Sequence, residues 1–364
     1  MAESGRRLTS LADVAQRAGV SVATASRVLS NSSYPVASET RQRVLDAAAD
    51  LDFSPNLAAR SLVAQRTSVI GLVVEDISTE HAGQLARGVE DMATENGFAV
   101  LVRSTDGDPQ SEISAARQFR SVRTDAVIYG CSSACHGEDE EGLIAQLRRI
   151  EEGGGVLIRI APHPRVAPDV SISMHQALSL SLGHLAELGH RRIAFLLGDP
   201  ESGQTMVALH AKGEILGELD LEADPAWCHS TALNHDGGRR VALALVAQRL
   251  PCTAVVAIDD TAAIGLLRGL ADAGVDVPAD ISVVGMDDIP AAAYASPALT
   301  TVRVPLRALG QTAMQTAIWL LGGGTRMGRN NLPVELVARA TTAAAPPSTV
   351  ATDGGRSSRS REDH

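Results

Sequence analysis

GVSVATASRVLS, residues 19–30, has the pattern of a tight turn followed by a short helix. Gly19 breaks the chain between the two helices, and Ser21 suits the N-cap of the second one. Before it, Ser10 and Asp13 have the spacing of a capping pair, which predicts the start of another helix. Two helices joined by a tight glycine-containing turn are typical of the helix-turn-helix, whose second helix enters the major groove of DNA.

The second helix, over about residues 22–29, divides into two faces. Helical spacing turns Ala25, Val28 and Leu29 inward. Thr24 and Ser26 can then reach phosphates, which positions a helix without reading sequence. Arg27 can bond a guanine edge, and the small Val22 and Ala23 permit close approach and methyl contacts to thymine. The alternative is a solvated helix within a small helical domain.

The helical head continues beyond this pair. A third helix is predicted over residues 38–51, and PNLAARSL, residues 55–62, has about two helical turns. Two turns are too short to be stable alone in water, so we expect this segment to be helical only when something holds it.

From Ser68 the pattern changes to apolar, β-branched runs separated by helical stretches, which is typical of βαβ units around a parallel sheet. The pattern restarts near residue 174, so two α/β lobes are expected. The predicted fold is a small all-α head followed by a two-lobed α/β domain with Rossmann-like parallel sheets. The predicted boundaries are 1–53 for the headpiece, 54–67 for the hinge and linker, 68–342 for the lobes (N-lobe 68–162 and 291–323, C-lobe 163–290 and 324–342) and 343–364 for a disordered tail.

Charge is distributed unevenly along the chain. The net charge is −11, but residues 1–66 hold eight arginines and six acidic residues and so carry +2. The remainder therefore carries −13. A mildly basic head on an acidic body fits a protein in which the head alone approaches phosphate, although +2 over this length is a weak signal.

The sequence does not indicate a membrane protein, a secreted protein, a metal-binding protein or an enzyme. No apolar run is long enough to span a bilayer, and the amino-terminal residues lack the apolar region of a secretory signal. Cys131, Cys135 and His136 lie close together, but their spacing is not that of a zinc site, so reduced thiols and no metal are expected. No nucleophile elbow, Walker loop or dinucleotide fingerprint occurs, so neither an enzyme nor a cofactor is predicted.

Several motifs in order carry a family resemblance. LTSLADVAQRAGVSVATASRVLSN and VASETRQRVLDAAADLDFSPNLAARSL are followed by IGLVVEDI, ELGHRRIAFLLG, DVPADISVVGMDDIP and PALTTVRVPLRALG. Together these motifs, over about residues 8–341, resemble the LacI/GalR (lactose-repressor) family of bacterial transcription regulators.

The resemblance implies a homodimer, or a tetramer, that binds a pseudo-palindromic operator in double-stranded DNA. It places Val22, Ala23 and Arg27 at base-reading positions. Residues at phosphate-contacting positions are Ser21, Thr24 and Ser26. It also implies a hinge helix that folds on DNA, with contacts from Asn56, Ala59 and Leu62, of which Leu62 wedges into a base step.

The resemblance further implies a small-molecule effector between the lobes. The residues at effector-binding positions are His81, Ala82, Arg159, His210, Asp259 and Asp287. Aromatic side chains that could stack on a sugar or base ring are missing at the matching positions, whereas His81, Arg159 and His210 supply possible cationic groups. One hypothesis is therefore an anionic or strongly polar effector such as a sugar phosphate. A neutral sugar and the loss of any ligand response are the alternatives.

The sequence therefore predicts a ligand-responsive repressor, acting as a dimer in the bacterial cytoplasm on the nucleoid and released by a small sugar-like or anionic effector. The alternative is a solute-binding protein of the periplasmic type, which shares the two-lobed plan. The missing signal region and the additional headpiece speak against that alternative.

Overall fold

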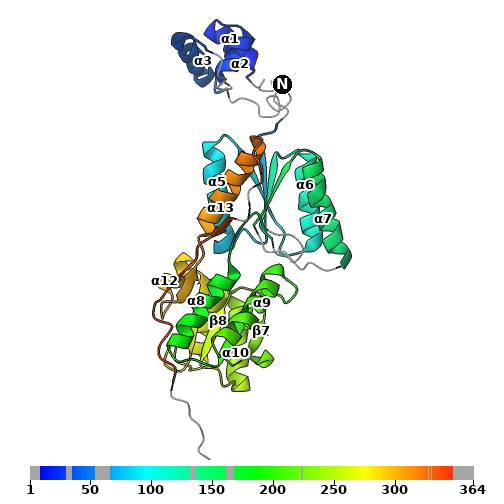
Figure 1. Ribbon diagram of the computed structural model, residues 1–364. Coiled ribbons are helices and arrows are strands. Elements are labelled where there is room, and N and C mark those ends of the chain that lie inside the picture. The colour runs from blue at the N-terminus through cyan, green and yellow to red at the C-terminus, as the bar shows by residue number, and fades with distance from the viewer. Residues whose placement is uncertain are drawn as a thin grey trace, which may run out of the picture. The chain divides into compact units, whose positions relative to one another are not determined.

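The computed structural model describes residues 9–29, 35–53, 66–131, 137–160, 168–222, 224–326, 328 and 330–346. They form two compact units. The first contains the helices at the amino end, and the second contains two α/β lobes (Figure 1). No helix of the described chain is long and apolar enough to cross a membrane.

The described part of the first unit contains three short helices: α1 (Leu11–Ala18), α2 (Val22–Leu29) and α3 (Ser38–Asp50). The predicted cap at the start of α1 is confirmed, because Ser10 and Asp13 form a reciprocal capping box. Gly19 ends α1 in the left-handed conformation, with a φ of 66°. The helices bury one small apolar core, whose members are Val14, Ala15, Ala18, Ala25, Val28, Val44, Ala47 and Ala48.

The N-lobe is built on a four-stranded sheet in the order β2–β1–β3–β4. The strands are β1 (Val69–Val74), β2 (Ala99–Ser104), β3 (Ala126–Tyr129) and β4 (Val156–Arg159). Helices α5 (Glu80–Glu95) and α13 (Leu306–Leu321) pack on one face, while α6 (Pro109–Ser121) and α7 (Gly137–Glu152) cover the other (Figure 1).

The C-lobe contains a six-stranded sheet in the order β12–β10–β9–β8–β6–β7. Its strands are β6 (Ile193–Leu197), β7 (Cys228–Ser230), β8 (Ala254–Ala257), β9 (Ser282–Asp287), β10 (Thr300–Arg303) and β12 (Glu335–Val337). All neighbours are parallel except β10 and β12.

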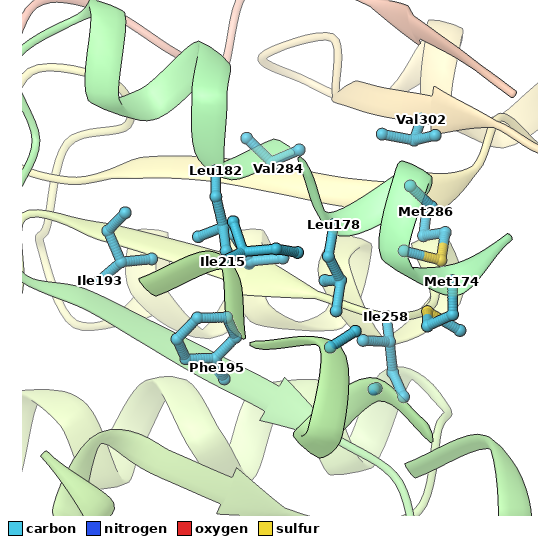
Figure 2. Packing of buried hydrophobic residues seen from close by; sticks show 14 of the residues in the cluster. Met174, Leu178, Leu182, Ile193, Phe195, Ile215, Ile258, Val284, Met286 and Val302 are labelled. Carbon is cyan, nitrogen blue, oxygen red and sulfur yellow. The ribbon is translucent and has the colours of Figure 1, made fainter. Parts of the chain in front are cut away.

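Helices cover both faces of this sheet. Helices α8 (Met174–Glu187) and α9 (Gly203–Glu218) lie on one face, and α10 (His235–Gln248), α11 (Asp260–Asp272) and α12 (Pro290–Tyr294) lie on the other. A short helix, η1 (Pro225–Trp227), precedes β7. Figure 2 shows the first face, where Leu178 and Leu182 of α8 and Ile215 of α9 pack on Phe195 of β6.

The chain passes between the lobes at positions that differ from those expected. Strand β10 pairs with β9, and Ala292 packs in the C-lobe core, so residues 291–303 lie in the C-lobe rather than in the N-lobe. Strand β5 (Val170–Ile172) pairs with β11 (Asn330–Leu332), and both contribute side chains to the N-lobe core. The crossovers therefore fall between β5 and α8, between β10 and α13, and between β11 and β12.

The start of the predicted disordered tail is fixed on the C-lobe. The backbone carbonyl of Ala343 accepts a hydrogen bond from Ser282 Oγ and lies 3.1 Å from His190 Nε2. The Ala345 N–H donates to the carbonyl of Leu188. The prediction of disorder is thus wrong for residues 343–346, because backbone groups rather than apolar side chains hold them; residues 347–364 lie outside the described chain.

Two glycines let α5 and α13 approach closely. A Cβ on Gly88 would lie 2.0 Å from the Arg307 carbonyl oxygen, and one on Gly310 would lie 2.2 Å from that of Leu85. Neither carbonyl belongs to a flexible side chain, so a larger residue would force the helices apart. This contact fixes the helix that carries His81.

We expect Gly88→Ala to lower the free energy of unfolding by about 1–3 kcal/mol through overpacking. Gly83→Ala in the same helix is the matched control, because a Cβ there meets nothing within 4 Å. The control should be neutral or stabilising by up to about 1 kcal/mol, since alanine is the better helix former. Urea denaturation measures both, and equal effects of the two variants would contradict the close approach.

Candidate DNA-reading helix and effector site

Helix α2 is capped as the sequence predicted. The Thr24 N–H donates to Ser21 Oγ at 3.1 Å, and the Ser21 and Thr24 hydroxyls lie 2.9 Å apart. Ala25 and Val28 are buried against the other helices of the unit, and Leu29 packs at the edge of that core. The inward face is therefore the predicted one.

The opposite face of α2 is open. Val22, Ala23, Ser26 and Arg27 are exposed, and the Val22 side chain is 48% exposed, although it is apolar. Val22 and Ala23 are not part of the apolar core of this unit. These side chains are therefore available to a partner, and they share one surface with a long cation. Asn56, Ala59 and Leu62, the other predicted DNA contacts, lie outside the described residues.

The candidate effector site gathers acidic side chains where strands end. Glu75 follows β1, Asp259 follows β8, and Asp287 is the last residue of β9. His81, at the start of α5, and Glu75 belong to the N-lobe, whereas Asp259 and Asp287 belong to the C-lobe. The His81 Nδ1 lies 3.1 Å from Asp287 Oδ2. The structure thus brings three of the six predicted effector residues together, namely His81, Asp259 and Asp287.

The charges around His81 determine its protonation. Burial lowers the pKa of His81, but the carboxylates of Asp287, Asp259 and Glu75 outweigh it and raise the pKa to about 9. Burial and the neighbouring Asp287 raise the pKa of Asp259 to about 7. The imidazolium of His81 is therefore the cation of an otherwise acidic cluster at neutral pH.

Asp287 has an unusual backbone that its neighbours hold in place. Its φ is 119°, and that of Asp288 is 57°, a region that non-glycine residues occupy at a cost of about 1–3 kcal/mol. The Asp288 carboxylate forms ion pairs with Arg303, at 2.6 Å, and with Arg339. Strain of this kind persists only where surrounding contacts hold the backbone in place. Here the strained backbone directs the Asp287 carboxylate toward His81.

A buried carboxylate supports the same turn from behind. Asp260 is fully buried, and it accepts hydrogen bonds from the Ile289 N–H at 3.0 Å and from Thr301 Oγ1 at 2.7 Å. Burial and the nearby Asp287 raise the pKa of Asp260 to about 8. Asp260 therefore fixes the strand ends and does not face the cluster as a ligand group.

Asp259 also has a structural role. Its Oδ1 accepts a hydrogen bond from the Ala262 N–H at 2.7 Å and so caps α11. Because a helix N-terminus favours a negative charge, this cap orients the carboxylate at the end of β8.

The other three predicted residues are placed differently. The Arg159 Nε lies 3.9 Å from Asp169 Oδ2, and Arg326 pairs with the same aspartate. The His210 side chain is 80% exposed on α9, and its Nε2 lies 3.6 Å from Glu214 Oε1. The Ala82 side chain is buried in the N-lobe core, so it cannot line a ligand site with its methyl group.

Sequence reasoning missed Glu75. It lies at the carboxyl end of β1, and its charge contributes to the raised pKa of His81. Burial raises the pKa of Glu75, with His81 opposing that change. The signal was present in VVED, because a carboxylate directly after a buried parallel strand lies at the edge where ligands bind.

Family models match both parts of this architecture. Residues 10–56 match the model for bacterial regulatory proteins of the lacI family. Residues 182–342 match the model for periplasmic binding protein-like domains.

Relatives and solved structures cover nearly the whole chain. The regulator reg1 of Streptomyces lividans is 35% identical over 93% of this chain and 98% of its own length. The regulator DegA of Bacillus subtilis is 30% identical over 92% of this chain and 98% of its own length. A Lac repressor dimer bound to operator and the anti-inducer ONPF is similar with a TM-score of 0.81 at 26% identity, over 93% of this chain and all of that one. With its helix-turn-helix head and two α/β lobes, the chain belongs to the LacI family of DNA-binding transcription regulators, which are not enzymes.

Proposed function

We propose that the chain is a dimeric repressor that reads its operator with α2 and is released by a neutral, hydroxyl-rich effector. The open face of α2, on which apolar Val22 and Ala23 lie beside Arg27, is the observation that carries the DNA-binding part. Ser21, Thr24 and Ser26 contact phosphates, and Val22, Ala23 and Arg27 contact base edges. Asn56, Ala59 and Leu62 make the hinge contacts, and the protein acts in the cytoplasm.

The His81–Asp287 pair and the acids around it support a sugar-like effector. Carboxylates of Asp287, Asp259 and Glu75 can each accept hydrogen bonds from hydroxyl groups, and the protonated His81 can donate one. A polyhydroxylated ligand supplies many donors and no charge, so it suits a cluster that already holds more negative than positive groups. An effector at this point touches residues from both lobes and can favour one arrangement of them over another.

An anionic effector has less support. The hypothesis of an anionic effector required Arg159, His210 and His81 to be free cations. In the structure Arg159 shares Asp169 with Arg326, and His210 pairs with Glu214. The remaining cation, His81, faces three carboxylates. A phosphate or carboxylate ligand would have to approach these acids, which costs Coulomb energy.

The assignment of Arg27 to a base edge leads to a prediction for operator affinity. Arg27→Ala should weaken binding to a duplex selected by the wild-type protein from a random library by about 1–3 kcal/mol, and should relax the preference at one base pair. Arg17→Ala removes the same charge and is the control, because Arg17 pairs with Asp50 on an exposed surface of the unit. Fluorescence anisotropy at fixed salt measures both variants.

Val22→Tyr and Ala23→Gln test the same face. Each should change the selected sequence without unfolding the head, because both positions are exposed. An unchanged selection by both variants, together with equal losses for Arg27→Ala and Arg17→Ala, would show that another surface reads the operator.

The effector class is tested by calorimetric titration of the full chain with a panel of neutral sugars and their phosphates. We expect binding of at least one neutral sugar, loss of that binding in Asp287→Ala, and no change in Arg159→Ala. Binding of phosphorylated sugars alone, with affinity lost in Arg159→Ala, would contradict the neutral assignment while leaving the DNA-binding role intact.

The protonation of His81 gives a pH prediction. Its folded-state pKa lies above the ordinary value, so the stabilisation from the Asp287 pair is complete below about pH 6.5 and is lost as the pH rises through about 9. Because the His81 side chain is 43% exposed, the pair should contribute about 1 kcal/mol or less. Histidine NMR should show a midpoint near 9 that moves toward 6.5 in Asp287→Asn. A wild-type midpoint at or below 6.5 would contradict the acidic environment.

A further inference from the structure

A pocket of about 600 Å³ lies on the C-lobe, beside α9 and the segment that leads through η1 into β7. Its walls combine three leucines with a lysine, a cysteine and two aspartates. The lining residues are Leu209, Lys212, Gly213, Leu216, Gly217, Asp220, Leu221, Asp224, Pro225 and Cys228. None of them belongs to the acidic cluster around His81.

Lys212 is the only lysine in the 364-residue chain, and the other 31 of its 32 lysine and arginine residues are arginines. Its Nζ lies 2.9 Å from Cys228 Sγ and 5.0 Å from the centre of the Phe195 ring. Among the described residues no carboxylate forms an ion pair with Lys212. The polar partner of this amine is therefore a thiol.

Contact with an amine and a place in the pocket wall separate Cys228 from the other described cysteines. Cys131 is buried, and burial raises the pKa of its thiol well above the ordinary value. Burial likewise raises the pKa of Cys252 to about 12. Cys228 is half-buried and lines the pocket, so a small oxidant can reach its sulfur. It is thus a reachable thiol with an amine in direct contact.

We propose that Lys212 and Cys228 form an oxidation-dependent covalent crosslink, a sulfenamide that joins α9 to β7. In the first step Cys228 Sγ attacks one oxygen of hydrogen peroxide. The O–O bond breaks, and the leaving hydroxide departs as water with the thiol proton, which gives a sulfenic acid. Such an acid condenses with a nearby nitrogen.

In the second step Lys212 Nζ attacks the sulfur. The S–N bond forms, the S–O bond breaks, and the hydroxyl group leaves as water with a proton from the nitrogen. In total, one thiol, one amine and one peroxide give one sulfenamide and two waters; the sulfur is oxidised by two electrons and the peroxide is reduced. Lysine can do this in its neutral form, whereas arginine stays protonated.

The single lysine makes the crosslink directly measurable. The full-length protein is treated with hydrogen peroxide, its remaining thiols are alkylated, and the denatured chain is digested with a lysine-specific endoproteinase. Untreated protein should be cut once, after Lys212. Peroxide-treated protein should lose this cleavage and, when weighed before alkylation, be lighter than untreated protein by two hydrogen atoms; a thiol reductant should restore both the cleavage and the mass.

Variants separate the crosslink from other oxidation products. Cys228→Ser should be cut fully after peroxide, whereas Cys252→Ser should remain protected. Lys212→Met should hold a sulfenic acid at Cys228 that dimedone traps. The proposal is overturned if peroxide leaves wild-type cleavage intact, or if Cys252→Ser abolishes protection, because a disulfide between cysteines leaves Lys212 available to the proteinase.

Discussion

The contact between His81 and Asp287 is the interaction on which the candidate effector site depends. One group belongs to a helix of the N-lobe and the other to the end of a C-lobe strand, so the contact joins the two lobes. Parallel strands bring several carboxylates to the same edge, and their mutual repulsion needs a counter-charge. The imidazolium of His81 supplies it, and the acids in turn keep His81 protonated.

Much of the surrounding structure holds this pair in position. Asp288 with Arg303 and Arg339, and the buried Asp260 with Thr301, fix a turn in which Asp287 has a strained backbone. On the other side, the close approach of α5 and α13 through Gly88 and Gly310 fixes the helix of His81. These local contacts determine which chemical groups the candidate site presents.

The sequence predicted those parts of the structure that depend on contacts between residues close together in the chain. It did not predict those that depend on contacts between distant residues. Ser10, Gly19 and Ser21 act on neighbours a few residues away, so the headpiece helices could be predicted from short patterns. The strand β10 has only four residues and pairs with a distant strand, so its place in the C-lobe could not. Arg159 counted as a free cation because nothing in the sequence places Asp169 and Arg326 beside it. Glu75 was predictable from its position after β1 and was overlooked.

Under the proposed function, occupancy of the His81–Asp287 site controls how tightly the headpiece binds DNA. The most direct measurement is thermodynamic linkage in the full chain: operator affinity with and without a saturating effector, and effector affinity with and without operator. The account predicts that the effector weakens operator binding and that the operator weakens effector binding by the same factor. An effector that binds at this site and leaves operator affinity unchanged would contradict it.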